Sequence, residues 1–168
     1  KTLMDKGQVA SLKVKILVLK HDYIPFETYQ EEMDYLVSHE QRNKFIMRLT
    51  KDLRGNTLVL FNYVERHGIP LYELLNSNVS QPVHLVHGGV DVDDREKIRA
   101  LAEETNDNII VASYGTFSTG INIKNLHNVI FASPSKSRVR NLQSIGRVLR
   151  KGDNKSQAVL YDIADNIS

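Results

Sequence analysis

Short apolar segments alternate with stretches of helical periodicity from Thr57 onward, and this alternation constrains the fold more than any other feature. The apolar segments predict strands at 57–61, 83–86, 108–112, 129–132 and 157–162. The stretches between them predict helices at 70–75, after Asp91, and from Ser137 to Lys151. Strands that alternate with helices at this spacing require crossover connections, which predict a mostly parallel sheet. Because the strand cores are almost wholly apolar, helices are expected on both faces of the sheet.

The first third of the chain has a different pattern. Residues 12–19 predict a further strand that enters the core, since apolar and polar residues alternate there and then give way to an apolar run. Residues 22–55 predict helices, because their apolar side chains recur every three or four positions, and Ser38 with Gln41 resembles a capping box. We therefore expect one α/β domain of about six strands, with 1–55 as a lead-in and 56–168 as the core.

Composition and single motifs exclude several classes of protein. The absence of Cys excludes disulfides and thiolate chemistry, and it fits a reducing compartment such as the cytoplasm. No apolar run approaches the length of a membrane span, so no membrane partner is expected. The chain has no signal peptide, and it begins at Lys1 instead of Met, which predicts a piece of a longer protein, with trimming as the alternative. No metal site is expected, because His39-Glu40 begins like a zincin motif but Asn43 replaces the second His.

Charge is segregated along the sequence. The net charge of the chain is +2, yet residues 108–152 contain no Asp or Glu and seven basic residues, whereas the remainder is net acidic. The basic residues of this block are Lys124, Lys136, Arg138, Arg140, Arg147, Arg150 and Lys151. Such a block predicts a polyanionic partner. The alternative is a basic surface that acidic residues elsewhere balance in space.

The predicted helix after Ser137 carries the strongest chemical signal. Its polar stripe consists of Arg140, Gln143, Arg147 and Arg150, and no acidic residue within the helix pairs with them. Arginine presents a planar charged fork that suits phosphate oxygens. Gly146 lies mid-helix, where it costs about 1 kcal/mol relative to Ala, which indicates close packing or close approach of a ligand. Val139, Leu142, Ile145 and Leu149 predict the buried stripe, and the alternative for the arginines is a solvated face.

Two segments that follow predicted strands resemble anion-binding loops. Residues 113–122 are rich in Gly, Ser and Thr and predict a loop that offers N–H groups and hydroxyls to phosphates. Gly115 and Gly120 have P-loop spacing, but Ile121-Asn122 replace the required Lys and Ser/Thr, so a Walker A site is excluded. The turn His87-Gly88-Gly89 with Arg95 is a weaker candidate, and both segments have a plain structural alternative. Four aromatic residues near the strand ends are candidates for base stacking: Phe61, Tyr63, Tyr114 and Phe117.

In order along the chain, these segments resemble the second motor domain of a superfamily 2 helicase, which has a RecA-like fold. Residues 143–150 match motif VI, Q-x-x-G-R-x-x-R, at every defined position. Residues 113–123 resemble motif V, and residues 58–61 resemble motif IV. His87-Gly88 with Arg95 resembles the turn and helix between those motifs. Asn141-Leu142 precede Gln143 where the DEAD-box form has His-Arg, which fits the DNA-directed branches better.

The resemblance implies a role for each matched residue. In the family, two RecA-like domains clamp ATP, and the first domain supplies the P-loop and the Mg-binding motif that this chain lacks. Arg147 and Arg150 are then expected to act as arginine fingers, with Gln143 positioning the nucleotide. The residues expected on the nucleotide side are Gly120, Asn122 and Gly146. The residues expected to contact the nucleic-acid backbone are Asn62, His87, Gly88, Ser113 and Thr116.

The function that the resemblance implies is that of a motor half of an ATP-dependent DNA helicase or translocase. It would remodel branched DNA by unwinding, branch migration and annealing in recombination, repair and replication restart. The expected partners are single-stranded or branched DNA and the N-terminal motor domain of the same chain, in a monomeric protein. The fragment alone is expected to hydrolyse almost no ATP. Two alternatives stay open: an RNA helicase motor half and a non-catalytic nucleic-acid-binding adaptor.

Overall fold

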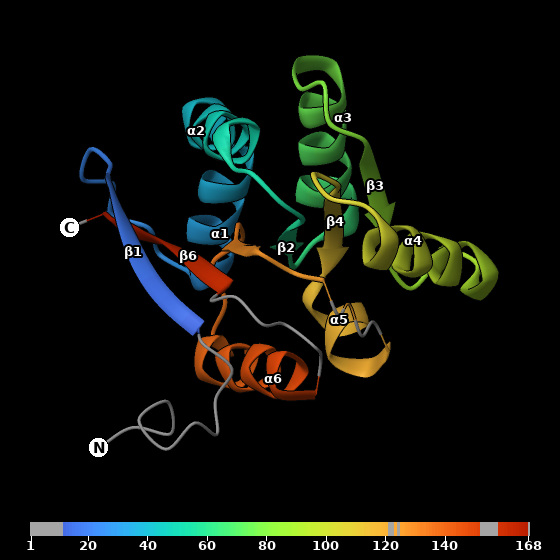
Figure 1. Ribbon diagram of the computed structural model, residues 1–168. Coiled ribbons are helices and arrows are strands. Elements are labelled where there is room, and N and C mark those ends of the chain that lie inside the picture. Colours follow the sequence, from blue (N-terminus) through green and yellow to red (C-terminus); the bar gives the residue numbers. More distant parts are fainter. Residues whose placement is uncertain (1–11, 121–122, 124, 152–157, 168) are drawn as a thin grey trace.

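The computed structural model describes residues 12–120, 123, 125–151 and 158–167, except for the side chains of residues 118–120 and 148–151. Its centre is one six-stranded sheet of order β1-β6-β5-β2-β4-β3, and every pairing in it is parallel (Figure 1). The strands are β1 (Leu12–Lys20), β2 (Thr57–Phe61), β3 (Val83–Val86), β4 (Ile109–Ser113), β5 (Asn128–Phe131) and β6 (Ala158–Asn166). The prediction of an α/β domain with a parallel sheet of about six strands is confirmed.

Helices cover both faces of the sheet, as the apolar strands require. They are α1 (Tyr29–Ser38), α2 (Glu40–Asp52), the π-helical turn η1 (Val64–Gly68), α3 (Ile69–Asn78), α4 (Val92–Glu104), α5 (Tyr114–Gly120) and α6 (Arg138–Lys151). Figure 1 shows α1, α2 and α3 on one face and α4, α5 and α6 on the other. Each face has its own hydrophobic core, one around Val59, Phe61 and Leu71 and the other around Leu60, Phe117 and Ile145.

The first strand lies at the edge of the sheet, and the prediction that it enters the core holds for one face only, where Leu17 and Leu19 pack against a hydrophobic core. Among the described strands, β1 pairs only with β6. Val14, Ile16 and Val18 point to the face that carries α6 and remain 42%, 57% and 60% exposed. The described residues thus leave one apolar face of this edge strand open to solvent.

The helical segment before β2 breaks at His39. The Thr28 hydroxyl accepts a hydrogen bond from the N–H of Glu31 and caps α1. His39 lies between α1 and α2, and its Nδ1 accepts from the N–H of Arg42 at 3.1 Å. The helix cap is therefore His39, and the predicted capping box at Ser38 is wrong, because Ser38 is the last residue of α1 and its hydroxyl bonds back to a carbonyl of that helix.

Candidate nucleotide and nucleic-acid interface

The parallel sheet brings the carboxyl ends of its strands to one edge, where ligands bind in open α/β sheets. Asn62 directly follows β2, Ser113 ends β4, and His87 directly follows β3. Because β2, β4 and β3 are neighbours in the sheet, these three positions form a row along that edge. The structure thus brings together the residues that the sequence places on the nucleic-acid side.

The segment after β4 is a helix and not the predicted loop. Ser113 caps it, since its Oγ accepts from the N–H of Thr116 at 3.1 Å and donates to the Thr116 hydroxyl at 2.7 Å. Thr116 is only 6% exposed. The burial of Tyr114 and Phe117 in the core beneath α4–α6 outweighs the poor helix propensity of the Gly and Thr residues here. The hydroxyls of Ser113 and Thr116 therefore hold the first turn of α5 together.

Burial decides which aromatic residues are available to a base. Phe61, Tyr114 and Phe117 lie in the hydrophobic cores and are not available for stacking. Tyr63 is half-buried, and the guanidinium carbon of Arg66 lies 4.4 Å from the centre of its ring. Arg66 also forms an ion pair with Asp34 of α1. One of the four aromatic candidates thus remains at the surface, and a cation of the same chain lies over its ring.

The backbone of the turn after β3 is exposed at Gly88 and Gly89. The Nδ1 of His87 accepts from the N–H of Gly89 at 3.0 Å, so the ring supports the turn. A Cβ added at Gly88 would meet no atom within 4 Å. Asp91 caps α4 by accepting from the N–H of Asp93 at 2.8 Å, as the sequence predicts. The Nε of Arg95 is buried without a hydrogen-bond partner within the described part of the chain.

Helix α6 presents Gln143 and Arg147 to solvent on one stripe. The Nη2 of Arg147 donates to the hydroxyl of Ser144 at 3.3 Å, which orients the guanidinium along the helix. A Cβ at Gly146 would meet no atom of the described residues within 4 Å, so packing among those residues does not explain this glycine. Val139 is 64% exposed on the same stripe, and its predicted burial is wrong, whereas Ile145 is fully buried as expected.

Three of the expected nucleotide-side residues fall partly or wholly outside the described residues. The backbone of Arg150 lies in α6, but its side chain is not among the described ones. Gly120 ends α5, and its surroundings are outside the description. Asn122 lies outside it altogether.

The basic block is only partly balanced by acidic residues. Arg138 forms an ion pair with Asp162 of β6, and the ammonium of Lys136 lies 4.1 Å from the centre of the Tyr29 ring. No ion pair with a carboxylate involves Arg140 or Arg147 within the ranges that the structure describes. These two exposed arginines are the ones that a phosphate can reach without breaking an ion pair.

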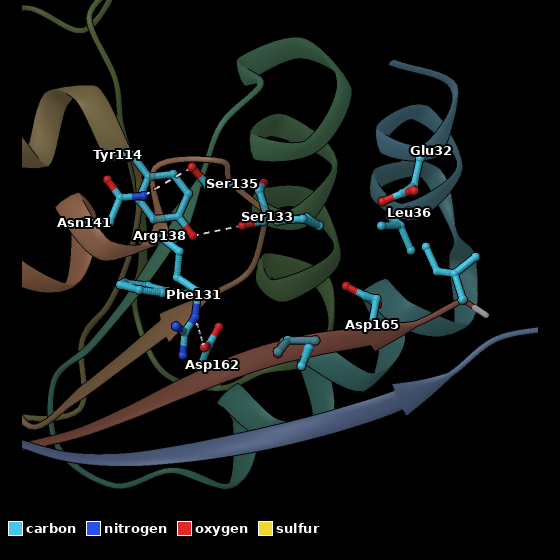
Figure 2. Close-up of a pocket in the computed structure, with 14 residues that line it drawn as sticks. Glu32, Leu36, Tyr114, Phe131, Ser133, Ser135, Arg138, Asn141, Asp162 and Asp165 are labelled. Carbon is cyan, nitrogen blue, oxygen red and sulfur yellow. Dashed lines mark hydrogen bonds and ion pairs between the residues drawn. The ribbon is translucent and has the colours of Figure 1, made fainter. Parts of the chain in front are cut away.

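A pocket of about 210 Å³ lies beside this edge, between α1, the start of α6 and the ends of β5 and β6 (Figure 2). Its polar wall contains Ser133, Ser135, Arg138, Asn141, Asp162 and Asp165. Figure 2 shows the Tyr114 hydroxyl pointing at Ser133 and the Asn141 amide pointing at Ser135. Sequence reasoning missed this cluster, because its members come from three segments, the stretch before α6, α6 itself and β6, and form no local motif.

A fully buried arginine stands behind the pocket. The Nε and Nη2 of Arg42 donate to the two oxygens of Asp165 at 2.9 and 3.0 Å, and its Nη1 donates to the carbonyl of Ala132 at 2.6 Å. The Nε2 of His21 contacts the same carboxylate at 2.8 Å. These bonds tie α2 and the residue after β1 to the ends of β5 and β6. The sequence signal for this buried ion pair is the position of Arg42, a charged residue on the apolar face of a predicted helix.

His67 fixes the position of Asn62 through Ser133. Its Nε2 donates to the amide oxygen of Asn43 at 2.9 Å, and the Asn43 amide nitrogen donates to the carbonyl of Val37. The Nδ1 of His67 therefore accepts from the Ser133 hydroxyl at 2.5 Å, and that oxygen accepts from the N–H of Asn62 at 3.0 Å. Burial, with a smaller contribution from Arg42, lowers the pKa of His67 to about 3, so the ring is neutral.

Two negative findings complete the site. Among the residues that the structure describes, no group of His, Cys, Asp or Glu has the arrangement of a metal site. Over the same residues, no helix has the length and apolar character that a membrane span requires.

Comparison with known proteins places this geometry in context. Residues 39–152 match the helicase conserved C-terminal domain. The chain is 40% identical over 172 residues to the ATP-dependent DNA helicase uvsW of Enterobacteria phage T4, covering 98% of this chain and 34% of that protein. It is 30% identical over 155 residues to the putative ATP-dependent RNA helicase L396 of Acanthamoeba polyphaga mimivirus, covering 88% and 28%. The chain thus spans about a third, or less, of the length of these relatives.

Solved structures give the same result for the fold. The crystal structure of T4 UvsW matches with a TM-score of 0.81 at 38% identity, over 95% of this chain and 33% of that one. The C-terminal domain of the DEAD-box protein Dbp5 matches with a TM-score of 0.63 at 14% identity, over 95% and 79%. The second likeness concerns the fold alone.

Proposed function

Because the chain belongs to the family of helicase conserved C-terminal domains, we propose that it is the second motor domain of an ATP-dependent DNA helicase that remodels branched DNA. The observation that carries the proposal is the exposed stripe of α6, where Gln143 and Arg147 flank the open face of Gly146. The 40% identity to a protein named a DNA helicase supports DNA as the substrate. The activity belongs to a longer protein, since the chain spans a third of that relative.

The residues of α6 fit a nucleotide phosphate that lies outside the domain. ATP would supply the phosphoryl group whose transfer to water powers the motor. Arg147, exposed and free of an acidic partner among the described residues, donates to phosphate oxygens and offsets their charge, and Arg150 on the same stripe is assigned the same role. Arginine fingers contribute about 10³–10⁵ in rate. We assign Gln143 to positioning the nucleotide, and Gly120, Asn122 and Gly146 to its binding.

As the family resemblance implies, we assign the magnesium ion that accompanies ATP to the N-terminal motor domain. Closure of the two domains around the nucleotide then brings Arg147 and Arg150 to it, and opening releases them. Each cycle of ATP hydrolysis shifts the contacts of this domain along one strand of the nucleic acid.

The row at the carboxyl edge supplies those contacts. We assign Asn62, His87, Gly88, Ser113 and Thr116 to the sugar–phosphate backbone. The hydroxyls of Ser113 and Thr116 bond to each other, and the Nδ2 of Asn62 donates to the carbonyl of Pro134. Backbone groups of the turns therefore carry most of these contacts, which read no base sequence. Contacts that do not depend on base sequence suit unwinding, annealing and branch migration in recombination, repair and replication restart. We assign these activities to a monomer in the cytoplasm, which is the host cytoplasm if the protein is from a phage.

An RNA helicase is the second candidate. The 30% identity to a protein named a putative RNA helicase favours it, and backbone-directed contacts serve either nucleic acid. A non-catalytic adaptor has less support, because an adaptor has no need of the exposed stripe with Arg147 and Gly146.

The test is ATP hydrolysis by the full-length protein with and without forked DNA. Arg150→Ala and Arg147→Ala are expected to lower the DNA-stimulated rate by about a thousandfold or more while DNA still binds. Arg48→Ala is the matched control, because it removes one exposed positive charge from α2, away from the candidate stripe of α6. If Arg150→Ala leaves hydrolysis intact and weakens DNA binding, the stripe is a nucleic-acid surface and the finger assignment is wrong. If RNA stimulates and DNA does not, the second candidate replaces the first.

A further inference from the structure

Three residues between β5 and α6 connect the two functional regions of this domain. Ser133, Pro134 and Ser135, here called the 133–135 segment, hydrogen-bond to the ends of β2 and β4 on one side and to the start of α6 on the other. We propose that this segment couples nucleic-acid binding at the carboxyl edge to the position of the arginine helix α6. The inference rests on the proposed function, since it assigns a role to residues that neither ligand touches.

The first half of the connection joins the segment to the nucleic-acid edge. The N–H of Asn62 donates to the Ser133 hydroxyl at 3.0 Å, and its side-chain amide donates to the carbonyl of Pro134 at 2.7 Å. The Tyr114 hydroxyl donates to the carbonyl of Ser133 at 2.9 Å, as Figure 2 shows. Tyr114 directly follows Ser113, so the segment is bonded to residues at the ends of both neighbouring strands.

The second half joins the segment to α6. The hydroxyl of Ser135 accepts from the N–H of Ser137 at 3.0 Å and from the side-chain amide of Asn141 at 3.4 Å. Asn141 lies in the first turn of the helix that carries Gln143 and Arg147. The ion pair between Arg138 and Asp162 fixes the same turn to β6. A displacement of Ser135 therefore acts on the end of α6 from which the arginine stripe begins.

The connection has little freedom to absorb a displacement. Ser133 is buried, and its hydroxyl is bonded to His67 and Asn62 at once. Tyr114 is also buried, and its ring packs edge-on against Phe131, with the ring centres 5.5 Å apart. Close-packed interiors transmit small shifts instead of dissipating them. A movement of Asn62 or Tyr114 on nucleic-acid binding is therefore passed to the segment and from there to α6.

Tyr114 and Ser135 are thus positioning residues. Their hydroxyls serve the connection and contact neither the nucleic acid nor the nucleotide. Loss of either hydroxyl is expected to weaken the dependence of hydrolysis on DNA while leaving hydrolysis without DNA in place. Loss of a single hydrogen bond from a coupling network corresponds to a change of about fivefold to tenfold in the coupling factor.

The experiment compares the ratio of ATPase rates with and without saturating forked DNA in the full-length protein. Tyr114→Phe is expected to lower this ratio about fivefold to tenfold, with DNA affinity and the rate without DNA within about twofold of wild type. Tyr72→Phe is the matched control, because it removes the same hydroxyl from a residue that packs on the opposite face of the sheet. Ser135→Ala is expected to act like Tyr114→Phe, and Ser135→Thr, which retains a hydroxyl, is expected to restore the ratio.

Each contrary outcome has its own meaning. If both rates fall together in Tyr114→Phe, the residue is merely structural and the coupling role is wrong. An unchanged ratio in Tyr114→Phe and Ser135→Ala, with a wild type that DNA stimulates, overturns the inference alone. A wild-type protein that no nucleic acid stimulates overturns the proposed function, and the coupling role with it.

Discussion

Arg42 gives the sharpest quantitative prediction for the fold. Its guanidinium is fully buried and makes three hydrogen bonds, two to Asp165 and one to the carbonyl of Ala132. Arg42→Met keeps much of the apolar volume, but it leaves the carboxylate of Asp165 buried with His21 as its remaining partner. Breaking a buried ion pair by removing one member costs about 3–5 kcal/mol. That is a large fraction of the roughly 5–15 kcal/mol by which a domain is stable.

Urea unfolding of the 168-residue chain, followed by circular dichroism, measures the loss directly. In a thermal scan the same loss corresponds to a fall of about 6–20 °C, at roughly 2–4 °C per kcal/mol for a domain of this size. Arg48→Ala, on the exposed face of α2, is the matched control and is expected to change the free energy of unfolding by less than about 0.5 kcal/mol.

The double variant Arg42→Met/Asp165→Asn isolates the physical cause. It removes the uncompensated charge, so it is expected to recover part of the loss. A single variant no less stable than Arg48→Ala would refute the reasoning. If the double variant were as unstable as the single one, the loss would come from packing and not from the unpaired carboxylate.

Three further predictions concern pH, glycine and activity. His67 has a pKa of about 3 when folded and near 6.5 when unfolded, so the unfolded chain binds the extra proton. Its contribution to stability is therefore complete above pH 6.5 and is lost as the pH falls toward 3, by up to about 1.4 kcal/mol per pH unit. In urea titrations at a series of pH values, His67→Gln is expected to reduce this dependence of the free energy of unfolding on pH. Gly68→Ala places a Cβ 2.5 Å from ring atoms of Phe61 and is expected to destabilise the chain by about 1–3 kcal/mol. Gly146→Ala meets no atom of the described residues within 4 Å, so it is expected to raise the free energy of unfolding by up to about 1 kcal/mol while lowering the ATPase activity of the full-length protein. The 168-residue chain alone is expected to hydrolyse ATP at background rate and to bind single-stranded DNA weakly in a fluorescence anisotropy titration. Robust DNA-stimulated hydrolysis by this chain would contradict the assignment of the P-loop to another domain.

The features that follow from local pattern were predictable, and those that depend on distant partners were not. Apolar strands alternating with helices are a local signal, so the parallel sheet and the cap at Asp91 follow from the sequence. The edge position of β1 depends on β6, whose paired residues lie more than a hundred positions away. The alternation of Val14 and Ile16 with lysines fits a half-buried strand and an edge strand equally well.

In the candidate site too, local sequence patterns predict some features, and others depend on residues far apart in the sequence. Asn62, His87 and Ser113 follow their strands directly, so their gathering at one edge is a consequence of parallel topology. Tyr114 to Gly120 has the composition of a loop, and only the core that buries Tyr114 and Phe117 makes it a helix. The pairing of Arg42 with Asp165 joins residues 123 positions apart, and no local spacing indicates it.

The pairing of the first strand with the last one also sets an order of events during synthesis. On the ribosome, β1 is made before the other five described strands, yet its only described neighbour in the sheet, β6, is made after them. Strands β2 to β5 can pair as they emerge, because each finds its neighbour within that group. The backbone of β1 therefore stays unpaired with its neighbour until β6 has been made. Pairing of β1 with β6 is therefore the most non-local step in forming this sheet, and non-local pairing is slow.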